Sequence, residues 1–125
     1  MNENDISYKI RGAIFNVYNT LGPGLLESVY EAALSYELSK DGLEIKTQAP
    51  IPVTYDEVKL DLGFRLDILV NEKVIIEIKS VEALAPVHHK QLLTYLKLTN
   101  KKLGLLVNFN TDNISSSIIR IANNL

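Results

Sequence analysis

The chain has 125 residues, 46% of them hydrophobic and 22% charged. We expect a single globular domain over residues 1–125. It contains no cysteine and only two histidines, which excludes disulfide bonds and thiolate metal ligands, so any bound metal must be held by oxygen atoms. The formal net charge is −2, so the chain lacks the bulk positive field of many nucleic-acid-binding proteins.

The N-terminal segment is polar, and no apolar run approaches the roughly 20 residues that a membrane-spanning helix requires. We therefore expect a soluble, cytoplasmic protein without a membrane partner.

The first forty residues predict two helices. The first begins near Asp5 as N-cap and ends at Gly22–Gly24, and its apolar positions recur at helical spacing: Ile6, Ile10, Ile14, Val17 and Leu21. A second amphipathic helix is expected from about Leu25 to Ser39, ending at Asp41 and Gly42. Its apolar stripe is predicted to consist of Leu26, Val29, Ala33 and Leu38.

Three extended segments follow. Residues 43–55 carry two prolines, which suits an edge strand or an irregular one, and Asp56 and Glu57 suit a turn. Residues 58–70 alternate between apolar and polar side chains and predict one long strand. Residues 74–80, VIIEIKS, predict a buried strand that two charged residues interrupt.

The last third predicts a helix, a strand and a helix. Residues 84–99 have helical spacing, with Pro86 in the first turn. Residues 103–109 are apolar enough for a central strand, and a short closing helix is expected from Ile114, behind Asp112. The predicted order is ααβββαβα, in an α/β protein.

The charges in VIIEIKS need a partner, because buried charged side chains are costly without one. Glu77 and Lys79 lie two residues apart, so they share one face of the strand, and Arg65 and Asp67 share a face of the preceding strand. A three-residue loop at 71–73 pairs Val70 with Val74 and places Asp67 opposite Glu77. The other face is then predicted to be uniformly apolar, formed by Phe64, Leu66, Ile68, Ile76 and Ile78.

Opposed carboxylates need a nearby cation, because at about 5 Å they repel each other by roughly 3 kcal/mol at an effective dielectric of about 20. The spacing alone leaves two interpretations. Arg65, Asp67, Glu77 and Lys79 form a neutral cross-strand salt network. Alternatively, Asp67 and Glu77 bind a divalent metal, and Lys79 aligns a water molecule or stabilises developing charge.

Asp67 followed by Glu77-Ile78-Lys79 resembles the D and ExK motifs of the PD-(D/E)XK nuclease superfamily, although Leu66 stands where that motif has proline. Gln91 and Tyr95 match the QxxxY motif of one branch of the superfamily. Residues 24–30, GLLESVY, are similar to the signature of the GxxExxY proteins. The resemblance covers nearly the whole chain.

This resemblance implies a restriction-endonuclease-like core of order αβββαβ, with a mixed sheet flanked by helices. It also implies a metal-dependent nuclease in which Asp67, Glu77 and the Ile78 carbonyl hold Mg²⁺, with Mn²⁺ able to substitute. Lys79 is then expected to align the attacking water. The remaining residues that it implicates are Gln91 and Tyr95, which orient phosphate or brace Lys79, and Glu27, which contacts the metal through water or binds a second metal.

The expected partner is nucleic acid, with DNA the leading substrate, and we expect a homodimer or a partner protein, since symmetric dimers are the commonest assembly. A different class of function stays open: a binding module that keeps the nuclease fold and holds nucleic acid or a protein without cutting it. The strandedness of the substrate and the position of the cut, at an end or in the interior, stay open as well.

Overall fold

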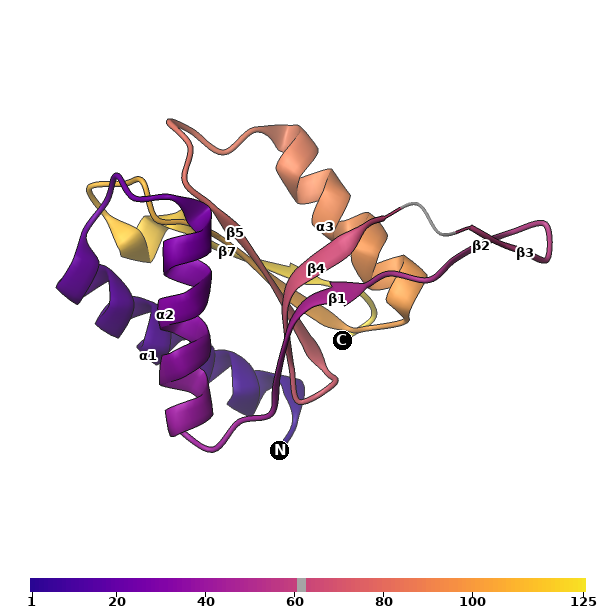
Figure 1. Ribbon diagram of the computed structural model, residues 1–125, viewed down its shortest axis with the longest axis horizontal. Coiled ribbons are helices and arrows are strands. Elements are labelled where there is room, and N and C mark those ends of the chain that lie inside the picture. The colour runs from indigo at the N-terminus through magenta and orange to yellow at the C-terminus, as the bar shows by residue number, and fades with distance from the viewer. Residues whose placement is uncertain (61–62) are drawn as a thin grey trace.

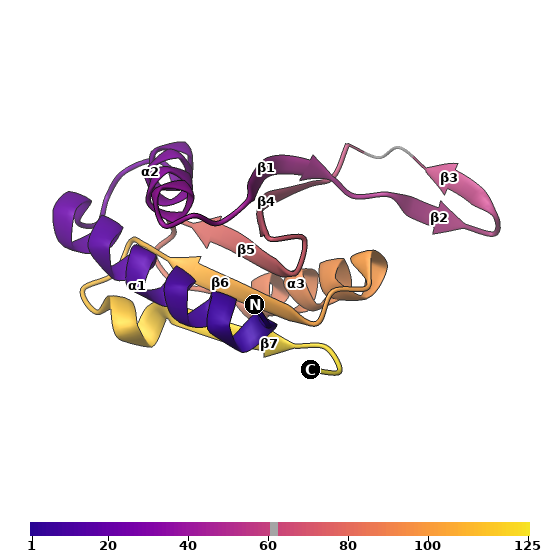
Figure 2. The same cartoon turned by 90° about the horizontal axis from the view of Figure 1, so that it is seen from below.

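The computed structural model describes residues 1–60 and 63–125 (Figure 1). A five-stranded sheet has the order β1-β4-β5-β6-β7, in which β5 and β6 are parallel and the other neighbours antiparallel. Helices α1 and α2 cover one face and α3 the other (Figure 2). The described elements are α1 (Glu3–Leu21), α2 (Glu27–Lys40), β1 (Ile45–Pro50), β2 (Val53–Tyr55), β3 (Val58–Leu60), β4 (Arg65–Val70), β5 (Val74–Lys79), α3 (Pro86–Thr99), β6 (Leu103–Asn108), the 3₁₀ helix η1 (Ile114–Ser117) and β7 (Ile118–Ala122).

The expected α/β fold with a mixed sheet flanked by helices is confirmed. In α1 the predicted apolar face is buried at Ile6, Ile10, Ile14 and Val17. Its N-cap is Asn2, not Asp5. The Asn2 side chain accepts a 2.9 Å hydrogen bond from the Asp5 N–H, in a capping box that satisfies two free helical donors.

The predicted apolar stripe of α2 is wrong at its first two positions, Leu26 and Val29, whereas Ala33 packs against the core and Leu38 is buried. Leu26 precedes the helix as its N-cap and is 74% exposed, and Val29 is 40% exposed. Tyr30 and Leu34, which were not predicted in this stripe, are buried as well. The Tyr30 ring stacks on Phe109 with ring centroids 4.3 Å apart, and this contact decides which face of the helix turns inward.

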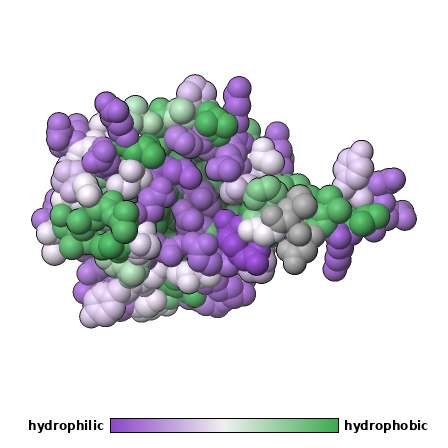
Figure 3. Space-filling model, turned by 45° about the horizontal axis from the view of Figure 1, so that its top comes forward, coloured by the Kyte–Doolittle hydropathy of each residue, from purple (hydrophilic) through white to green (hydrophobic). Residues whose placement is uncertain are grey.

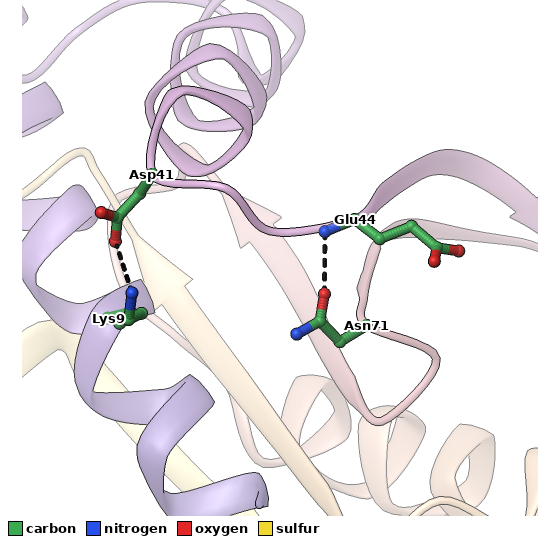
Figure 4. A network of polar contacts seen from close by, with 4 residues as sticks. All are labelled: Lys9, Asp41, Glu44 and Asn71. Atoms are coloured by element: carbon green, nitrogen blue, oxygen red, sulfur yellow. Dashed lines mark hydrogen bonds and ion pairs between the residues drawn. The ribbon is translucent and has the colours of Figure 1, made fainter. Parts of the chain in front are cut away.

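The predicted register of β4 and β5 is confirmed, since Val70 pairs with Val74 and Ile68 with Ile76. The Asn71 side chain fixes the turn between them by accepting a 2.8 Å hydrogen bond from the Glu44 N–H, just before β1 (Figure 4). A Lys9–Asp41 ion pair of 3.5 Å joins α1 to the end of α2 nearby (Figure 4).

The predicted uniformly apolar face holds only in part. Ile68, Ile76 and Ile78 pack in the core beneath α1 and α2. Leu66 belongs to the apolar cluster packed between the sheet and α3, called the α3 cluster below, and Phe64 lies against Tyr95 of α3. The alternation changes sides at Asp67, where the β1–β4 ladder is interrupted.

Residues 58–70 do not form one long strand. β3 pairs with β2 in a separate two-stranded sheet, while β4 pairs with β1 and β5. The prediction for residues 61 and 62 lies outside the described residues. The β2–β3 hairpin projects from the body as an arm (Figures 1 and 3). Its turn lies at Asp56 and Glu57, as predicted, and both residues have positive φ.

The predicted closing helix is wrong. After the short η1, residues 118–122 form β7, which is antiparallel to β6. The reason is the free edge of β6: once this central strand is buried, its unpaired backbone groups require a partner, and the β-branched Ile118, Ile119 and Ile121 suit a strand. No helix in the described ranges is long and apolar enough to cross a membrane.

Candidate active site at the β4–β5 strand pair

The carboxylates of Asp67 and Glu77 lie together where the β4–β5 backbone ladder ends. The backbone N–H of Asp67 donates a 3.2 Å hydrogen bond to Glu77 Oε1. The backbone N–H of Ile78 donates a 2.8 Å hydrogen bond to Asp67 Oδ2. Each carboxylate is therefore bound to the backbone of the other strand, and the predicted Asp67–Glu77 juxtaposition is present.

Glu77 is only 5% exposed, which is unusual for a glutamate without a cationic partner. Burial, and then the charge of Asp67, raise its pKa to about 8, whereas the charge of Lys79 lowers it only slightly. Among the ion pairs of the described residues, none joins Arg65 or Lys79 to either carboxylate. The neutral salt network predicted as one interpretation is thus not formed.

A cavity of about 210 Å³ opens onto Asp67 from the α2 side. It is lined by Glu27, Ser28, Glu31, Gln48, Asp67 and Ile78. Glu27, the first residue of α2, therefore reaches the site as expected from the sequence. The cavity is the place where α2 and the β4–β5 pair can share a ligand.

Glu31 and Gln48 were not predicted as site residues from the sequence. Gln48 Nε2 donates a 2.6 Å hydrogen bond to Glu31 Oε1 and lies 3.5 Å from Asp67 Oδ1. Burial raises the pKa of Glu31, the Gln48 hydrogen bond lowers it, and the Asp67 charge raises it again. The helical spacing from Glu27 to Glu31 is a signal that could have found this acid, because residues four apart share a helix face. Nothing local in the sequence identifies Gln48.

The GLLESVY segment is organised by Tyr30. The Tyr30 hydroxyl donates to the Gly22 carbonyl at 2.5 Å and accepts from the Leu25 N–H at 3.1 Å. The Ser80 hydroxyl donates to the Leu25 carbonyl at 2.7 Å. Gly24 has φ +95°, a conformation that glycine adopts most readily. These contacts tie the start of α2, and hence Glu27, to the chain just after Lys79.

On the opposite face, α3 contributes Tyr95. This side chain is 9% exposed. Burial, followed by the charges of Glu77 and Asp67, raises the pKa of its hydroxyl. Gln91 lies one turn earlier and is exposed. Lys79, at the end of β5, is half-buried.

The donor set fits a hard divalent cation better than any other group. Within the described ranges, no three acidic or histidine side chains form a ready metal cluster, so the site offers two carboxylates and backbone oxygen. Because burial beside Asp67 raises the pKa of Glu77 to about 8, ionising both acids leaves negative charge without compensation. A dication bound by oxygen ligands would offset this charge, and Mg²⁺ typically needs only one or two carboxylates together with water and phosphate.

A family model described as the PD-(D/E)XK nuclease superfamily matches residues 4–121. No curated protein and no solved structure matches the chain significantly. The model match spans nearly all of the 125 residues, and the mixed sheet flanked by helices agrees with the superfamily fold. The chain therefore belongs to the PD-(D/E)XK nuclease superfamily.

Proposed function

We propose that this protein is a Mg²⁺-dependent nuclease that hydrolyses phosphodiester bonds of DNA, with Mn²⁺ able to substitute, and that it belongs to the GxxExxY branch. The observation that carries the proposal is the contact between half-buried Asp67 and buried Glu77, whose pKa is about 8. A buried acid beside a second acid is costly to ionise without a cation. Such a pair is expected where a bound cation completes the structure.

In this proposal Asp67, Glu77 and the Ile78 carbonyl hold the metal, and Glu27 contributes from the first turn of α2 directly or through water. A divalent metal bound there would lower the pKa of a water molecule and neutralise charge on the phosphoryl oxygens. Water as the nucleophile makes no use of a 2′-hydroxyl, so the chemistry suits DNA.

Lys79 leaves β5 on the same face as Glu77, two residues further on. Its ammonium group is proposed to hold the attacking water by a hydrogen bond and to stabilise the negative charge that grows on the phosphate. Tyr95 and Gln91, one helical turn apart on α3, are proposed to donate hydrogen bonds to phosphate or to brace Lys79.

A binding module without catalysis is the second candidate. It is favoured by one observation: in the described residues the two carboxylates are not joined by a third ligand side chain into a metal cluster. A module of this kind would hold nucleic acid or a protein equally well with and without metal. For either candidate we propose a homodimer in the cytoplasm, which light scattering of the purified protein and fractionation of cells would test.

The test of the proposed function is cleavage of labelled single- and double-stranded DNA and RNA in Mg²⁺, Mn²⁺ or EDTA. Wild type should cut only with metal, and Lys79→Ala, purified identically, should lose at least about a hundredfold in turnover. Lys97→Ala, which removes an exposed lysine of α3, is the matched control and should cut normally. Metal-independent binding without product would instead favour the binding module.

A further inference from the structure

Gln48 lies in the middle of β1 with a backbone conformation that strands do not use. Its φ is +51°, and glutamine rarely occupies this left-handed region. The neighbouring residues pair normally, Thr47 with Ile68 and Ala49 with Leu66, but the ladder skips the pair that would join Gln48 to Asp67. A strained residue in an otherwise regular strand persists only where its surroundings require it.

The side chain of Gln48 indicates what requires it. Its amide nitrogen reaches two carboxylates on different elements, Glu31 Oε1 of α2 at 2.6 Å and Asp67 Oδ1 of β4 at 3.5 Å. The other oxygen of Asp67 is bound by the Ile78 N–H at 2.8 Å. Both oxygens of Asp67 therefore have a donor within 3.5 Å, one on β5 and one on β1.

The chemistry of an amide suits this task. A lysine or arginine at the same place would supply the missing positive charge itself and would compete with a bound cation. The amide nitrogen donates hydrogen bonds and carries no net charge. It can therefore hold Glu31 and Asp67 side by side and leave their negative charge available.

We propose that Gln48 is a positioning residue: its left-handed backbone directs the amide between Glu31 and Asp67 and so holds Asp67 in place for the metal-dependent reaction. This inference rests on the proposed function. On this inference the interruption of β1 is a functional feature. If Gln48 paired with Asp67 in the regular ladder, its backbone could not adopt the left-handed conformation that directs the amide between the two carboxylates.

Two variants separate the backbone from the side chain. Gln48→Ala and Gln48→Gly both remove the amide, but only glycine relieves the left-handed backbone. We expect the glycine variant to unfold about 3 °C higher than the alanine variant. Both variants should lose about tenfold in turnover at saturating substrate, and about fivefold in Mn²⁺ affinity measured by calorimetry, since the carboxylates no longer have a common donor.

Two control variants accompany them. Asn100→Gly makes the same kind of backbone exchange at the C-cap of α3, where φ is +54°, and Thr47→Ala truncates the neighbouring exposed residue of β1. Both should keep turnover and Mn²⁺ affinity within twofold of wild type. Normal turnover and Mn²⁺ affinity in the two Gln48 variants would overturn the positioning role. A glycine variant no more stable than the alanine variant would overturn the backbone strain.

A failure of the proposed function is distinguishable from a failure of this inference. If wild type neither binds Mn²⁺ nor cleaves, the nuclease proposal fails. The contact itself is then tested in EDTA by thermal unfolding of Gln48→Ala, Glu31→Ala and the double variant. Shifts of the unfolding midpoint that do not add support the Gln48–Glu31 contact, and additive shifts overturn it.

Discussion

The carboxylate of Asp67 and the backbone N–H of Ile78 are joined by a 2.8 Å hydrogen bond that crosses from β4 to β5. It replaces the backbone ladder, whose last described pair is Ile68–Ile76. Glu77 makes the reciprocal contact with the Asp67 N–H. The acids are thus part of the pairing of the two strands, and substitutions that keep an acceptor oxygen can change their charge while the strands stay paired.

Asp67→Asn keeps an acceptor for the Ile78 N–H and removes one negative charge. We expect at least about a tenfold loss of Mg²⁺ and Mn²⁺ affinity, because the proposed site then has a single carboxylate from the two strands. Isothermal calorimetry measures the affinity, and Asp41→Asn, on the exposed end of α2, is the control. Equal metal affinity in wild type and Asp67→Asn would exclude Asp67 as a ligand.

Glu77 should make stability depend on pH. Its pKa in the folded protein is about 8, above the ordinary glutamate value of 4.5, so between these values the unfolded chain releases this proton and the folded chain keeps it. The stabilisation is complete below about pH 4.5 and is lost as the pH rises through about 8. In EDTA, the thermal unfolding midpoint of wild type should fall over this pH window relative to that of Glu77→Gln. Parallel curves for the two proteins would contradict the raised pKa.

Tyr95→Phe removes a hydroxyl and keeps a ring that packs in the α3 cluster. We expect turnover to fall about tenfold, as is usual when a donor to developing charge is lost, with an unfolding midpoint within a few degrees of wild type. Steady-state kinetics and calorimetric melting check this prediction. A large drop in stability at unchanged turnover would assign Tyr95 a structural role alone.

Tyr30→Phe should destabilise the protein, because the Gly22 carbonyl and the Leu25 N–H lose their partner. We expect a loss of about 1–3 kcal/mol in the free energy of unfolding, while the stack on Phe109 keeps the fold. Urea titration measures the loss. Tyr36→Phe, at a tyrosine that is 66% exposed, serves as control and should be neutral.

Glu27 and Glu31 line the same cavity, and Glu31 is bound to Gln48 and lies in the field of Asp67. We expect Glu31→Gln to weaken Mn²⁺ binding more than Glu27→Gln does, by about threefold or more, since Glu31 interacts electrostatically with the proposed ligand Asp67. Calorimetry of both variants decides the order. The reverse order would favour Glu27, the acid expected from the sequence.

Much of the site could be predicted from local patterns. The three-residue turn at 71–73 sets the β4–β5 register, because strand pairing next to a tight turn leaves no freedom. That register brings Asp67 to Glu77 without any knowledge of the remaining fold. Helical spacing likewise predicted that Gln91 and Tyr95 share one face of α3. Only the tertiary structure shows that Tyr95 is buried and Gln91 exposed.

The misses share a physical cause, since each depends on contacts between residues far apart in the chain. Residues 118–122 became a strand because β6 had a free edge to pair. The stripe of α2 was set by the stack of Tyr30 on Phe109. Gln48 joined the site because β1 lies beside β4 and because α2 lies above both.

The sequence by itself determined the residue types of the site, the register of its two strands and the two helices that flank it, because these follow from side-chain periodicity and from a short turn. Only the tertiary structure decided that Glu77 is buried with a raised pKa, and that Glu31 and Gln48 reach Asp67. Burial and through-space hydrogen bonds depend on how distant elements pack, and no local pattern of residues carries that information.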